Sequence, residues 1–347
     1  MPDRRLVINC RWMGKEVTGT ERYASEVTRQ LLQMPGLDIT LLVPAAIEVP
    51  EWAKGAKISR SRLDGVLFEQ FAIPFRTMFR HVLNMGGPAP ILKRNQSVVL
   101  YDASVFRFPE NFSTGFVAWY KFLYWTLPRV ALRIVTISDF SATEISQLVK
   151  IPLKDITVAT CGSDHADRFV PKHPHLEISG DFVVCVGTLA KRKNLVPIID
   201  KLSESGIRTV VVGASGTSRI FGDEPDTRVP NSNITFAGRL TDDEVAWLFD
   251  HALALIFPSL YEGFGLPIVE AQARGCPVIA ARSSSIPEVI GSGGTMFCPY
   301  EPAQAVEAVL ALIENPAMRE RLAVEGRRNA SRFKWRRTAE IIVSQLP

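Results

Sequence analysis

Short apolar runs alternate with stretches of helical periodicity, and this alternation runs through the chain twice. Runs rich in β-branched residues indicate strands that are buried on both faces of a parallel sheet. Predicted strands of the first series lie at 6–9, 37–44, 97–102, 133–138 and 156–162, with helices at 20–32 and 142–149. Predicted strands of the second series lie at 181–187, 208–214, 233–238, 252–258 and 276–281, with a helix from about 194 to 205. The chain is therefore expected to form two doubly wound α/β domains.

The segment between the two series marks the expected domain boundary. Residues 162–180 are rich in His, Pro and charge, which is typical of a linker. We place an N-terminal domain at 1–165 and a C-terminal domain at 166–330. The last segment, from about 303 to 346, has helical character and adds no strand.

Composition narrows the function classes. The 347 residues carry a formal net charge of only +4, which does not favour nucleic acid as a partner. Five scattered cysteines form no C-x-x-C pair, and five histidines show no ligand spacing, so neither disulfides nor a metal site is expected. The N-terminus has too short an apolar run for a signal peptide, and no apolar window reaches membrane-spanning length. We expect a cytoplasmic protein, with peripheral contact to the inner face of a membrane left open.

One loop between a predicted strand and a helix has the features of an anion site. Glu262 to Glu270 reads EGFGLPIVE and follows the strand at 252–258. Pro267 suits the first turn of a helix, and the helix N-terminus with glycines beside it suits a diphosphate. A glutamate one turn into the helix could accept hydrogen bonds from a ribose diol. Taken alone, Glu262 could equally be a loop carboxylate and Glu270 a partner of the helix dipole.

The wider motif resembles a known family. The two glutamates of E-x7-E, within FPSLYEGFGLPIVEAQARGCPVIA, resemble the signature of family-4 retaining glycosyltransferases. This resemblance implies the GT-B fold, in which two Rossmann-like domains with parallel sheets face each other across a cleft. It also implies that the C-terminal domain binds a nucleotide sugar and the N-terminal domain presents the acceptor.

The resemblance assigns roles to residues of the C-terminal half. In VGTLAKRKNL, Lys193 occupies the position that binds the donor diphosphate, with Arg192 beside it and Thr188 where many members have arginine. Glu262 is expected beside the transferred sugar and Glu270 at the ribose. The remaining donor contacts fall on the nucleobase segment, at Phe236, Gly238, Arg239 and Leu240, and on the sugar and phosphate loop, at Gly263, Phe264, Gly265 and Leu266.

The N-terminal half resembles a branch that includes mannosyl- and rhamnosyltransferases. MGKEVTGTERYASEV resembles its glycine-containing loop, so Gly19 is expected near the donor phosphate or sugar. In VVLYDASVFRFPENF, Asp102 is retained, but Tyr101 stands where the family has histidine. We expect Asp102 to take part in catalysis with Glu262 and Lys193. RFKWRRTAEII resembles the helix that crosses back, so residues 331–347 are expected to pack on the N-terminal domain.

The expected reaction is transfer of a hexose, without a metal, from a nucleotide sugar to a glycan or a polyprenyl-diphosphate-linked acceptor during surface polysaccharide (for example lipopolysaccharide) biosynthesis. GDP-mannose is the first expectation for the donor, and dTDP-rhamnose or a UDP-sugar is the alternative. A catalytically silent nucleotide-sugar-binding subunit, and a GT-B phosphorylase or epimerase, remain alternative functions. The aromatic and basic segment 118–133 could lie against a membrane, or it could be an ordinary packed helix.

Overall fold

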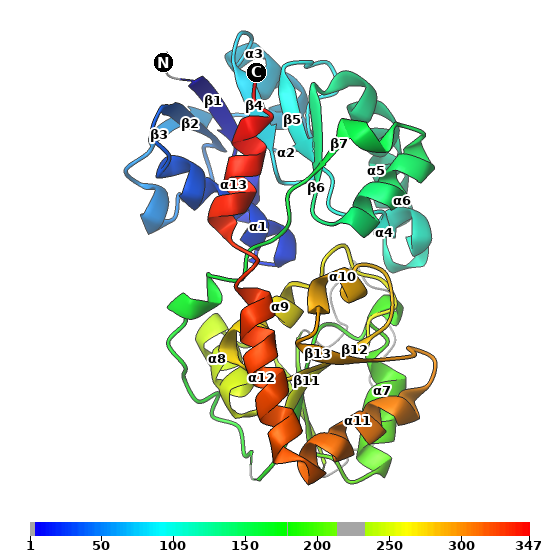
Figure 1. Cartoon of the computed structure of the whole chain (residues 1–347). Helices are drawn as coiled ribbons and strands as arrows, with labels where there is room; N and C mark the ends of the chain where they lie inside the picture. The colour runs from blue at the N-terminus through cyan, green and yellow to red at the C-terminus, as the bar shows by residue number, and fades with distance from the viewer. Residues whose placement is uncertain (1–3, 179, 214–232) are drawn as a thin grey trace. The chain divides into compact units, whose positions relative to one another are not determined.

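The chain forms two compact units, each with its own parallel sheet (Figure 1). The computed structural model describes residues 4–178, 180–213 and 233–347. Unit 1 comprises Met1–Phe106, Gly115–Gly162 and Trp335–Pro347. Unit 2 comprises Arg107–Thr114 and Ser163–Lys334. The chain thus passes from one unit to the other after Gly162, and its last helix returns to unit 1.

Unit 1 has a seven-stranded parallel sheet with the order β3-β2-β1-β4-β5-β6-β7. Its strands are β1 Arg4–Asn9, β2 Leu37–Pro44, β3 Lys57–Ser61, β4 His81–Asn84, β5 Gln96–Val99, β6 Arg133–Thr136 and β7 Ile156–Val158. Its helices are α1 Gly19–Leu32, α2 Gly65–Leu67, α3 Ile73–Arg76, α4 Ser104–Arg107, α5 Thr114–Val130, α6 Asp139–Val149 and α13 Trp335–Ser344. A π-helical turn, η3 Phe68–Ala72, joins α2 to α3.

The C-terminal helix α13 packs beside α1 in unit 1, as Figure 1 also shows. Trp335 is fully buried, and its ring meets the ring of Tyr23 edge to face at 5.7 Å. The hydroxyl of Thr338 donates to the carbonyl of Thr160 at 2.6 Å. This packing explains why the end of the chain folds with its beginning, since a buried tryptophan contributes several kcal/mol, about 3–5 when it is truncated.

Unit 2 has a six-stranded parallel sheet with the order β10-β9-β8-β11-β12-β13. Its strands are β8 Val183–Val186, β9 Thr209–Val212, β10 Ile234–Gly238, β11 Ala254–Phe257, β12 Val278–Ala281 and β13 Gly294–Phe297. Its helices are α7 Leu195–Glu204, α8 Asp242–His251, α9 Leu266–Arg274, α10 Ile286–Ile290, α11 Pro302–Glu314 and α12 Pro316–Ala330.

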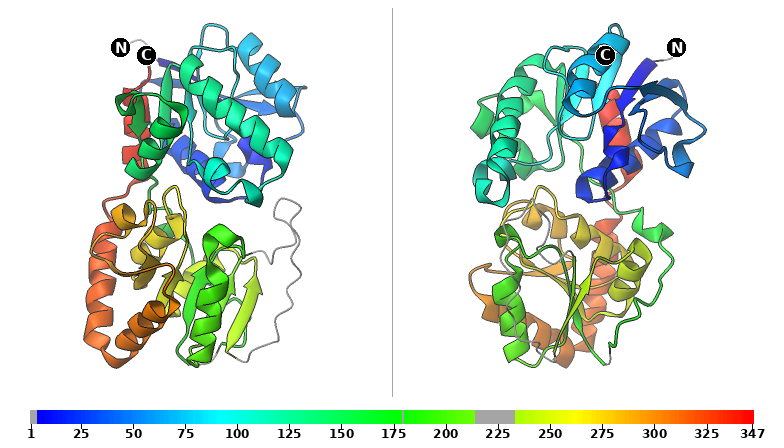
Figure 2. Two further views of the ribbon diagram at one scale, coloured as in Figure 1. Left: turned by 90° about the vertical axis from the view of Figure 1, so that its right-hand side faces the viewer. Right: turned by 180° about the vertical axis from the view of Figure 1, so that it is seen from behind.

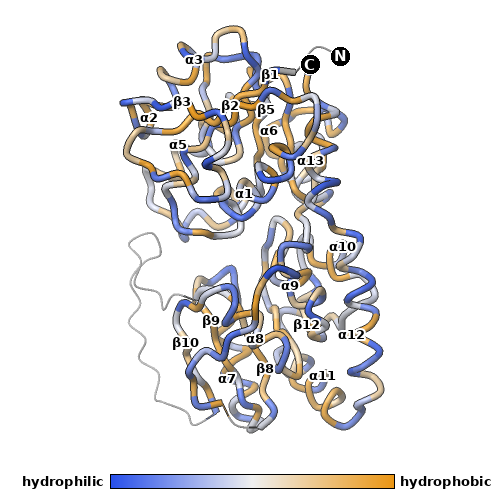
Figure 3. Tube along the Cα trace, turned by 90° about the vertical axis from the view of Figure 1, so that its left-hand side faces the viewer, coloured by the Kyte–Doolittle hydropathy of each residue, from blue (hydrophilic) through white to orange (hydrophobic). Residues whose placement is uncertain are grey.

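Helices flank both faces of the unit 2 sheet (Figure 2). On one face α7 packs against α11, and on the other α9 packs against α8 and α12. In Figure 3, α11 and α12 carry both hydrophobic and hydrophilic stretches, as expected of helices with one face on a core. The strands themselves are buried, which matches their continuous apolar sequences.

Several predicted element bounds were wrong. The strand predicted at 97–102 ends at Val99, and the one at 156–162 ends at Val158, because the polypeptide turns into loops there. In the strand predicted at 208–214, β9 ends at Val212, and Ala214 lies outside the described residues.

The sequence interpretation also missed three strands, and each has an identifiable reason. β3 is an edge strand with mostly exposed polar residues, β4 combines apolar residues with His81 and Asn84, and β13 is a short run that begins with glycine. None of them shows the continuous apolar run on which the prediction relied.

Candidate functional site

Two charged side chains meet at the point where the strand order of the unit 2 sheet reverses, between β8 and β11. β8 is the first strand of the unit in sequence, β9 lies on one side of it and β11 on the other. Lys193 ends the 3-10 turn η7 Lys191–Lys193 after β8, and Glu262 lies in the loop after β11. Nζ of Lys193 donates to Oε1 of Glu262 at 2.6 Å. Ligands of doubly wound sheets bind outside the carboxyl ends of the strands at such a switch point.

The environment of Glu262 keeps it ionised. The residue is only 9% exposed. Burial by itself raises the pKa of the Glu262 carboxyl, but the charges of Lys193 and Arg192 outweigh this effect and hold the pKa below its usual 4.5. The nearer guanidinium nitrogen of Arg192 lies 3.9 Å from Oε2. Two cations therefore face one carboxylate, leaving a local excess of positive charge.

Arg192 has a buried donor that the protein leaves unused. Within the described residues, its Nε has no hydrogen-bond partner. A buried N–H without an acceptor costs about 1–3 kcal/mol, so such groups commonly mark a ligand or water position. Beside Lys193, this donor suits an anionic oxygen.

Hydrogen bonds fix the loop that carries Glu262. Its backbone N–H donates to the hydroxyl of Ser284 at 2.9 Å. The hydroxyl of Ser285 lies 3.0 Å from the carbonyl of Glu262 and 3.1 Å from that of Phe264. Leu260 N–H donates to the carbonyl of Arg192 at 2.8 Å, which ties this loop to the turn after β8. The relative position of the charged groups is thus set by backbone contacts as well as by their own attraction.

The same loop leads directly into helix α9. Gly265 precedes Leu266, the first helical residue, with a φ of 96°, a conformation that glycine adopts without strain. Pro267 follows in the first turn, where its lack of an N–H costs no helical hydrogen bond. The positive end of the α9 dipole therefore lies next to Gly263, Phe264 and Glu262. Phe264 is buried and its ring packs edge to face on Phe333.

Glu270, one turn into α9, is held by a residue that the sequence interpretation missed. Nε2 of His165 lies 2.7 Å from Oε1 of Glu270. Because an ionised carboxylate only accepts hydrogen bonds, Nε2 carries the proton and donates it. His165 is fully buried and its ring also meets Phe169 edge to face. The signal was the polar stretch GSDHADR, residues 162–168, which the linker assignment covered.

The predicted nucleobase residues lie on another part of the unit 2 sheet. Strand β10 is at the edge, separated from β11 by β9 and β8. Phe236 is 41% exposed, and Gly238 has a φ of 63° while its carbonyl accepts from Gly213 N–H at 2.8 Å. Arg239 and Leu240 follow the strand, the first exposed and the second half-buried. These four residues therefore lie at β10, which β9 and β8 separate from β11, the strand that precedes the loop of Glu262.

In unit 1, the Tyr101 side chain is held by backbone groups. Its hydroxyl lies 2.5 Å from the carbonyl of Met85 and 3.1 Å from that of Thr20, so it links the loops after β4 and β5 to the start of α1. Burial raises its pKa well above the usual value. Asp102 accepts a hydrogen bond from Ser104 N–H at 2.8 Å. Gly19 is the first residue of α1, and an added Cβ would meet nothing within 4 Å.

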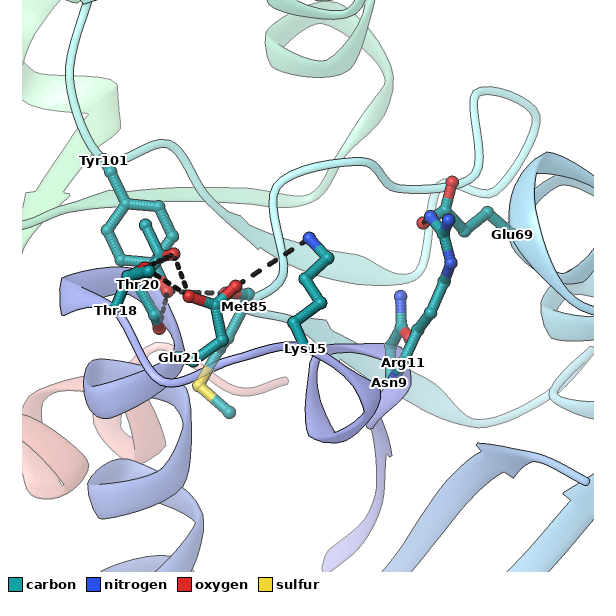
Figure 4. Close-up of polar contacts among 9 residues, drawn as sticks. All are labelled: Asn9, Arg11, Lys15, Thr18, Thr20, Glu21, Glu69, Met85 and Tyr101. Atoms are coloured by element: carbon teal, nitrogen blue, oxygen red, sulfur yellow. Dashed lines mark hydrogen bonds and ion pairs between the residues drawn. The ribbon is translucent and has the colours of Figure 1, made fainter. Parts of the chain in front are cut away.

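A second polar cluster in unit 1 was not foreseen from the sequence. Figure 4 shows Glu21 with Thr18, Thr20 and Lys15 around its carboxylate, and Arg11 beside Glu69. The Glu21 carboxylate accepts from the hydroxyl of Thr20 at 2.8 Å and lies 3.8 Å from Nζ of Lys15.

The pair formed by Arg11 and Glu69 is buried more deeply. An Arg11 nitrogen donates to Oε1 of Glu69 at 2.6 Å. Glu69 is only 2% exposed, and burial raises its pKa even though Arg11 opposes that shift. Glu69 is invisible to motif reasoning because its partner Arg11 lies 58 positions away in the sequence.

Among the residues with described positions, no three His, Cys, Asp or Glu side chains cluster closely enough to hold a metal ion. None of the helices in the described ranges combines the length and the apolar character needed to cross a membrane.

Comparisons with known proteins show what the chain is similar to. The family described as "Glycosyl transferases group 1" matches residues 172–329. The O-antigen chain mannosyltransferase B of Escherichia coli is 29% identical over 68% of this chain and 65% of its own length. The O-antigen chain mannosyltransferase RfbU of Salmonella typhimurium is 22% identical over 90% of this chain and 92% of its own. The match to the serotype-specific mannosyltransferase WbdA of E. coli is 26% identical over 60% of this chain and covers 28% of the relative, so this chain spans less than two thirds of the first relatives.

Solved structures extend the likeness to the whole chain. Anabaena HepE in complex with UDP-glucose superposes with a TM-score of 0.73 at 17% identity, covering 99% of both chains. Sucrose-phosphate synthase from Thermosynechococcus elongatus gives a TM-score of 0.73 at 15% identity, covering 98% of both. At these identities the likeness establishes the fold. The chain is thus similar to glycosyl transferases group 1 over residues 172–329, and its two parallel-sheet units have the GT-B fold.

Proposed function

We propose that the protein is a retaining glycosyltransferase that moves a hexose from a nucleotide sugar to a glycan acceptor in surface polysaccharide biosynthesis. The observation that carries the proposal is the buried pair of Lys193 and Glu262 at the switch point of the unit 2 sheet, next to the N-terminus of α9. This place combines two cations and a helix dipole, which suit a diphosphate, with a carboxylate that suits a sugar.

The leaving diphosphate determines the first set of roles. Lys193 and Arg192, with the N-terminus of α9, supply positive charge where a nucleoside diphosphate departs. Nζ of Lys193 is paired with the Glu262 carboxylate at 2.6 Å. A bound diphosphate competes for the ammonium and leaves the Glu262 carboxylate facing the sugar. This charge supply supports transfer without a metal ion.

The donor ribose determines the second set of roles. Glu270 lies one turn into α9, and its carboxylate is held by His165. A carboxylate with one oxygen fixed in this way can accept hydrogen bonds from a vicinal diol. Phe236, Gly238, Arg239 and Leu240 at the end of β10 would then border the base.

GDP-mannose is the proposed donor. The supporting observation is that relatives over 68% and 90% of this chain are named mannosyltransferases. A structural neighbour holds UDP-glucose, so a UDP-sugar is the first competitor and dTDP-rhamnose the second. A thermal-shift series with GDP, UDP and dTDP separates them, because a ligand that binds only the folded state raises the melting temperature with its concentration over Kd. A larger shift with UDP or dTDP than with GDP would refute the GDP-mannose proposal.

The acceptor is proposed to bind unit 1 and to be a glycan or a polyprenyl-diphosphate-linked oligosaccharide. The same unit is proposed to contribute Gly19, near the donor phosphate or transferred sugar, and Asp102, in catalysis. Tyr101 stays protonated near neutral pH because its pKa is raised, so it can orient a group but not act as a base.

Donor hydrolysis and transfer by the purified protein test the activity. Release of nucleoside diphosphate, lost in Glu262→Ala and reduced in Lys193→Met, supports the proposal, and NMR of the product reports whether the anomeric configuration is retained. An exposed substitution in the same unit, Val324→Ser, is the matched control. Tight donor binding without turnover, in the presence of glycan and lipid-linked acceptors, would instead identify a silent binding subunit.

A further inference from the structure

The helical stretch of residues 65–76 in unit 1 has an apolar surface on two sides. It consists of α2, the π-helical turn η3 and α3. Its inner side packs into the core, where Phe68, Ala72 and Ile73 cluster with side chains from the sheet. A helix that is apolar on all sides is ordinarily buried on all sides. The outer side of this one is not.

The outer side is a row of large apolar residues that repeat every four positions. Leu67 is 54% exposed, Phe71 62%, Phe75 81%, and Phe79, in the turn that follows, 90%. Further exposed apolar residues of the same stretch are Leu63, Val66 and Met78. We call these seven residues the phenylalanine ridge. Residues four apart in a helix lie close to one face, so Leu67, Phe71 and Phe75 form a row, and Phe79 follows in the next turn.

Arginines surround the ridge. The exposed basic residues of this stretch are Arg60, Arg62, Arg76 and Arg80. Within residues 60–80, all of which are described, the acids are Asp64, which lies 3.6 Å from Arg11, and the buried Glu69. The surface therefore combines exposed aromatic rings with an excess of positive charge.

A hollow beside the ridge shares this chemistry. A cavity of about 870 Å³ is lined by arginines and ridge residues, among them Arg60, Arg62, Leu63, Phe71, Phe75 and Arg76. Guanidinium groups bind phosphate oxygens through paired hydrogen bonds, and apolar walls suit hydrocarbon. The hollow thus offers both contacts that a phospholipid makes at the surface of a bilayer.

We propose that the phenylalanine ridge docks the protein on an anionic phospholipid surface. The rings enter the boundary between headgroups and acyl chains, and the arginines pair with lipid phosphates. A second copy of the chain is a poorer occupant, because a twofold contact would bring the arginines of one ridge against those of the other. With respect to a lipid-linked acceptor the inference rests on the proposed function, but docking itself requires neither donor nor acceptor.

The segment 118–133, which the sequence suggested for membrane contact, exposes less apolar surface than the phenylalanine ridge. In α5, Leu123 and Leu127 are buried, while Phe122 and Trp125 are 47% and 43% exposed. The guanidinium of Arg129 stacks 4.8 Å above the Trp125 ring and covers part of it. A variant at Trp125 therefore distinguishes the two surfaces.

The test is sedimentation of the full-length protein with vesicles in the absence of nucleotide. Vesicles of phosphatidylglycerol and phosphatidylethanolamine are compared with vesicles of phosphatidylcholine alone. We expect binding to the anionic vesicles that weakens with salt. It should fall roughly 30-fold in Arg76→Gln/Arg80→Gln, since each of the two cations near such a surface contributes a factor of roughly five. Phe75→Ser/Phe79→Ser should weaken it by at least roughly 100-fold. Trp125→Ser and Val324→Ser are controls and should bind as the wild type does.

Three outcomes would overturn the inference. The wild type could fail to bind anionic vesicles, the ridge variants could bind as well as the wild type, or Trp125→Ser alone could abolish binding. Light scattering without lipid gives a fourth outcome. If the wild type is a dimer and Phe75→Ser/Phe79→Ser is a monomer, the ridge binds a second copy of the chain. The nucleoside diphosphate assay in solution is separate, so loss of docking with intact donor hydrolysis leaves the proposed function standing.

Discussion

The imidazole of His165 lies 2.7 Å from the carboxylate of Glu270, 105 positions away in the sequence. His165 is completely buried, so its imidazole is held in place and can orient the carboxylate of the glutamate. His165 precedes the 3-10 turn η6 Ala166–Arg168, which packs on α9. The contact therefore joins the segment with which the chain enters unit 2 after Gly162 to α9, the helix that is proposed to bind the donor ribose.

Replacing His165 by phenylalanine should weaken donor binding more than turnover. Without the Nε2 donor, Glu270 loses its fixed orientation, and the KM for the nucleotide sugar should rise roughly tenfold, the cost of about one hydrogen bond to a charged group. The value of kcat should change less, because the reacting atoms lie elsewhere. Steady-state kinetics measure both.

His165→Gln offers the conservative comparison, since its amide can still donate to Glu270. The KM of this variant should lie close to the wild-type value. As a control, His173→Gln, at a histidine in an exposed segment, should leave KM unchanged. A phenylalanine variant with wild-type KM would show that the contact supports the fold alone.

Lys193 and Glu262 should be coupled in stability. Each single change, Lys193→Met or Glu262→Gln, leaves a charge in a buried place and should lower the free energy of unfolding by about 3 kcal/mol. The double variant should lose clearly less than the sum of the two, because it leaves neither charge unpaired. Urea denaturation of the wild type, the two single variants and the double variant gives the coupling free energy. Strictly additive losses in the free energy of unfolding would contradict the coupling.

The same pair gives a defined pH dependence. The folded-state pKa of Glu262 lies below its usual 4.5, so the folded protein holds the charged form more tightly than the unfolded chain does. The contribution is therefore complete above about 4.5 and is lost as the pH falls through the lowered folded-state value. Unfolding curves from pH 7 to 3 should show wild type and Glu262→Gln converging toward acid. Parallel curves over this range would show that the pair does not titrate as proposed.

Gly213 should tolerate no side chain. Its φ is 142°, and an added Cβ would lie 2.2 Å from the carbonyl oxygen of Gly187, in the loop after β8. Gly213→Ala should therefore lower the free energy of unfolding of unit 2 by about 3 kcal/mol or more, since both strain and overlap act. Gly36→Ala is the control, because that glycine has a φ of 77° but nothing within 4 Å, and it should cost only about 1 kcal/mol. Equal losses in the two variants would rule out the close approach at Gly187.

The buried strands were predictable because their chemistry is local. β11 is buried throughout and β2 along its second half, so these residues form apolar runs that are visible in the sequence. β3 lies at an edge with polar residues exposed, and β4 hides a polar network, in which Asn84 accepts from Asn9 at 3.0 Å and donates to Gln96 at 2.9 Å. Polar groups satisfied by remote partners look like loop residues in the sequence.

The sequence by itself determined two doubly wound units, the loop with Glu262 at a helix start, and a cation in the turn after β8. These features follow from apolar periodicity and from the preferences of Gly and Pro, which act between neighbours in the chain. Only the tertiary structure brought Lys193 to Glu262, His165 to Glu270 and Arg11 to Glu69, and only it left the phenylalanine ridge uncovered. The reason is physical: burial, ion pairing and exposure depend on which distant segments pack together, and that is decided by the whole fold.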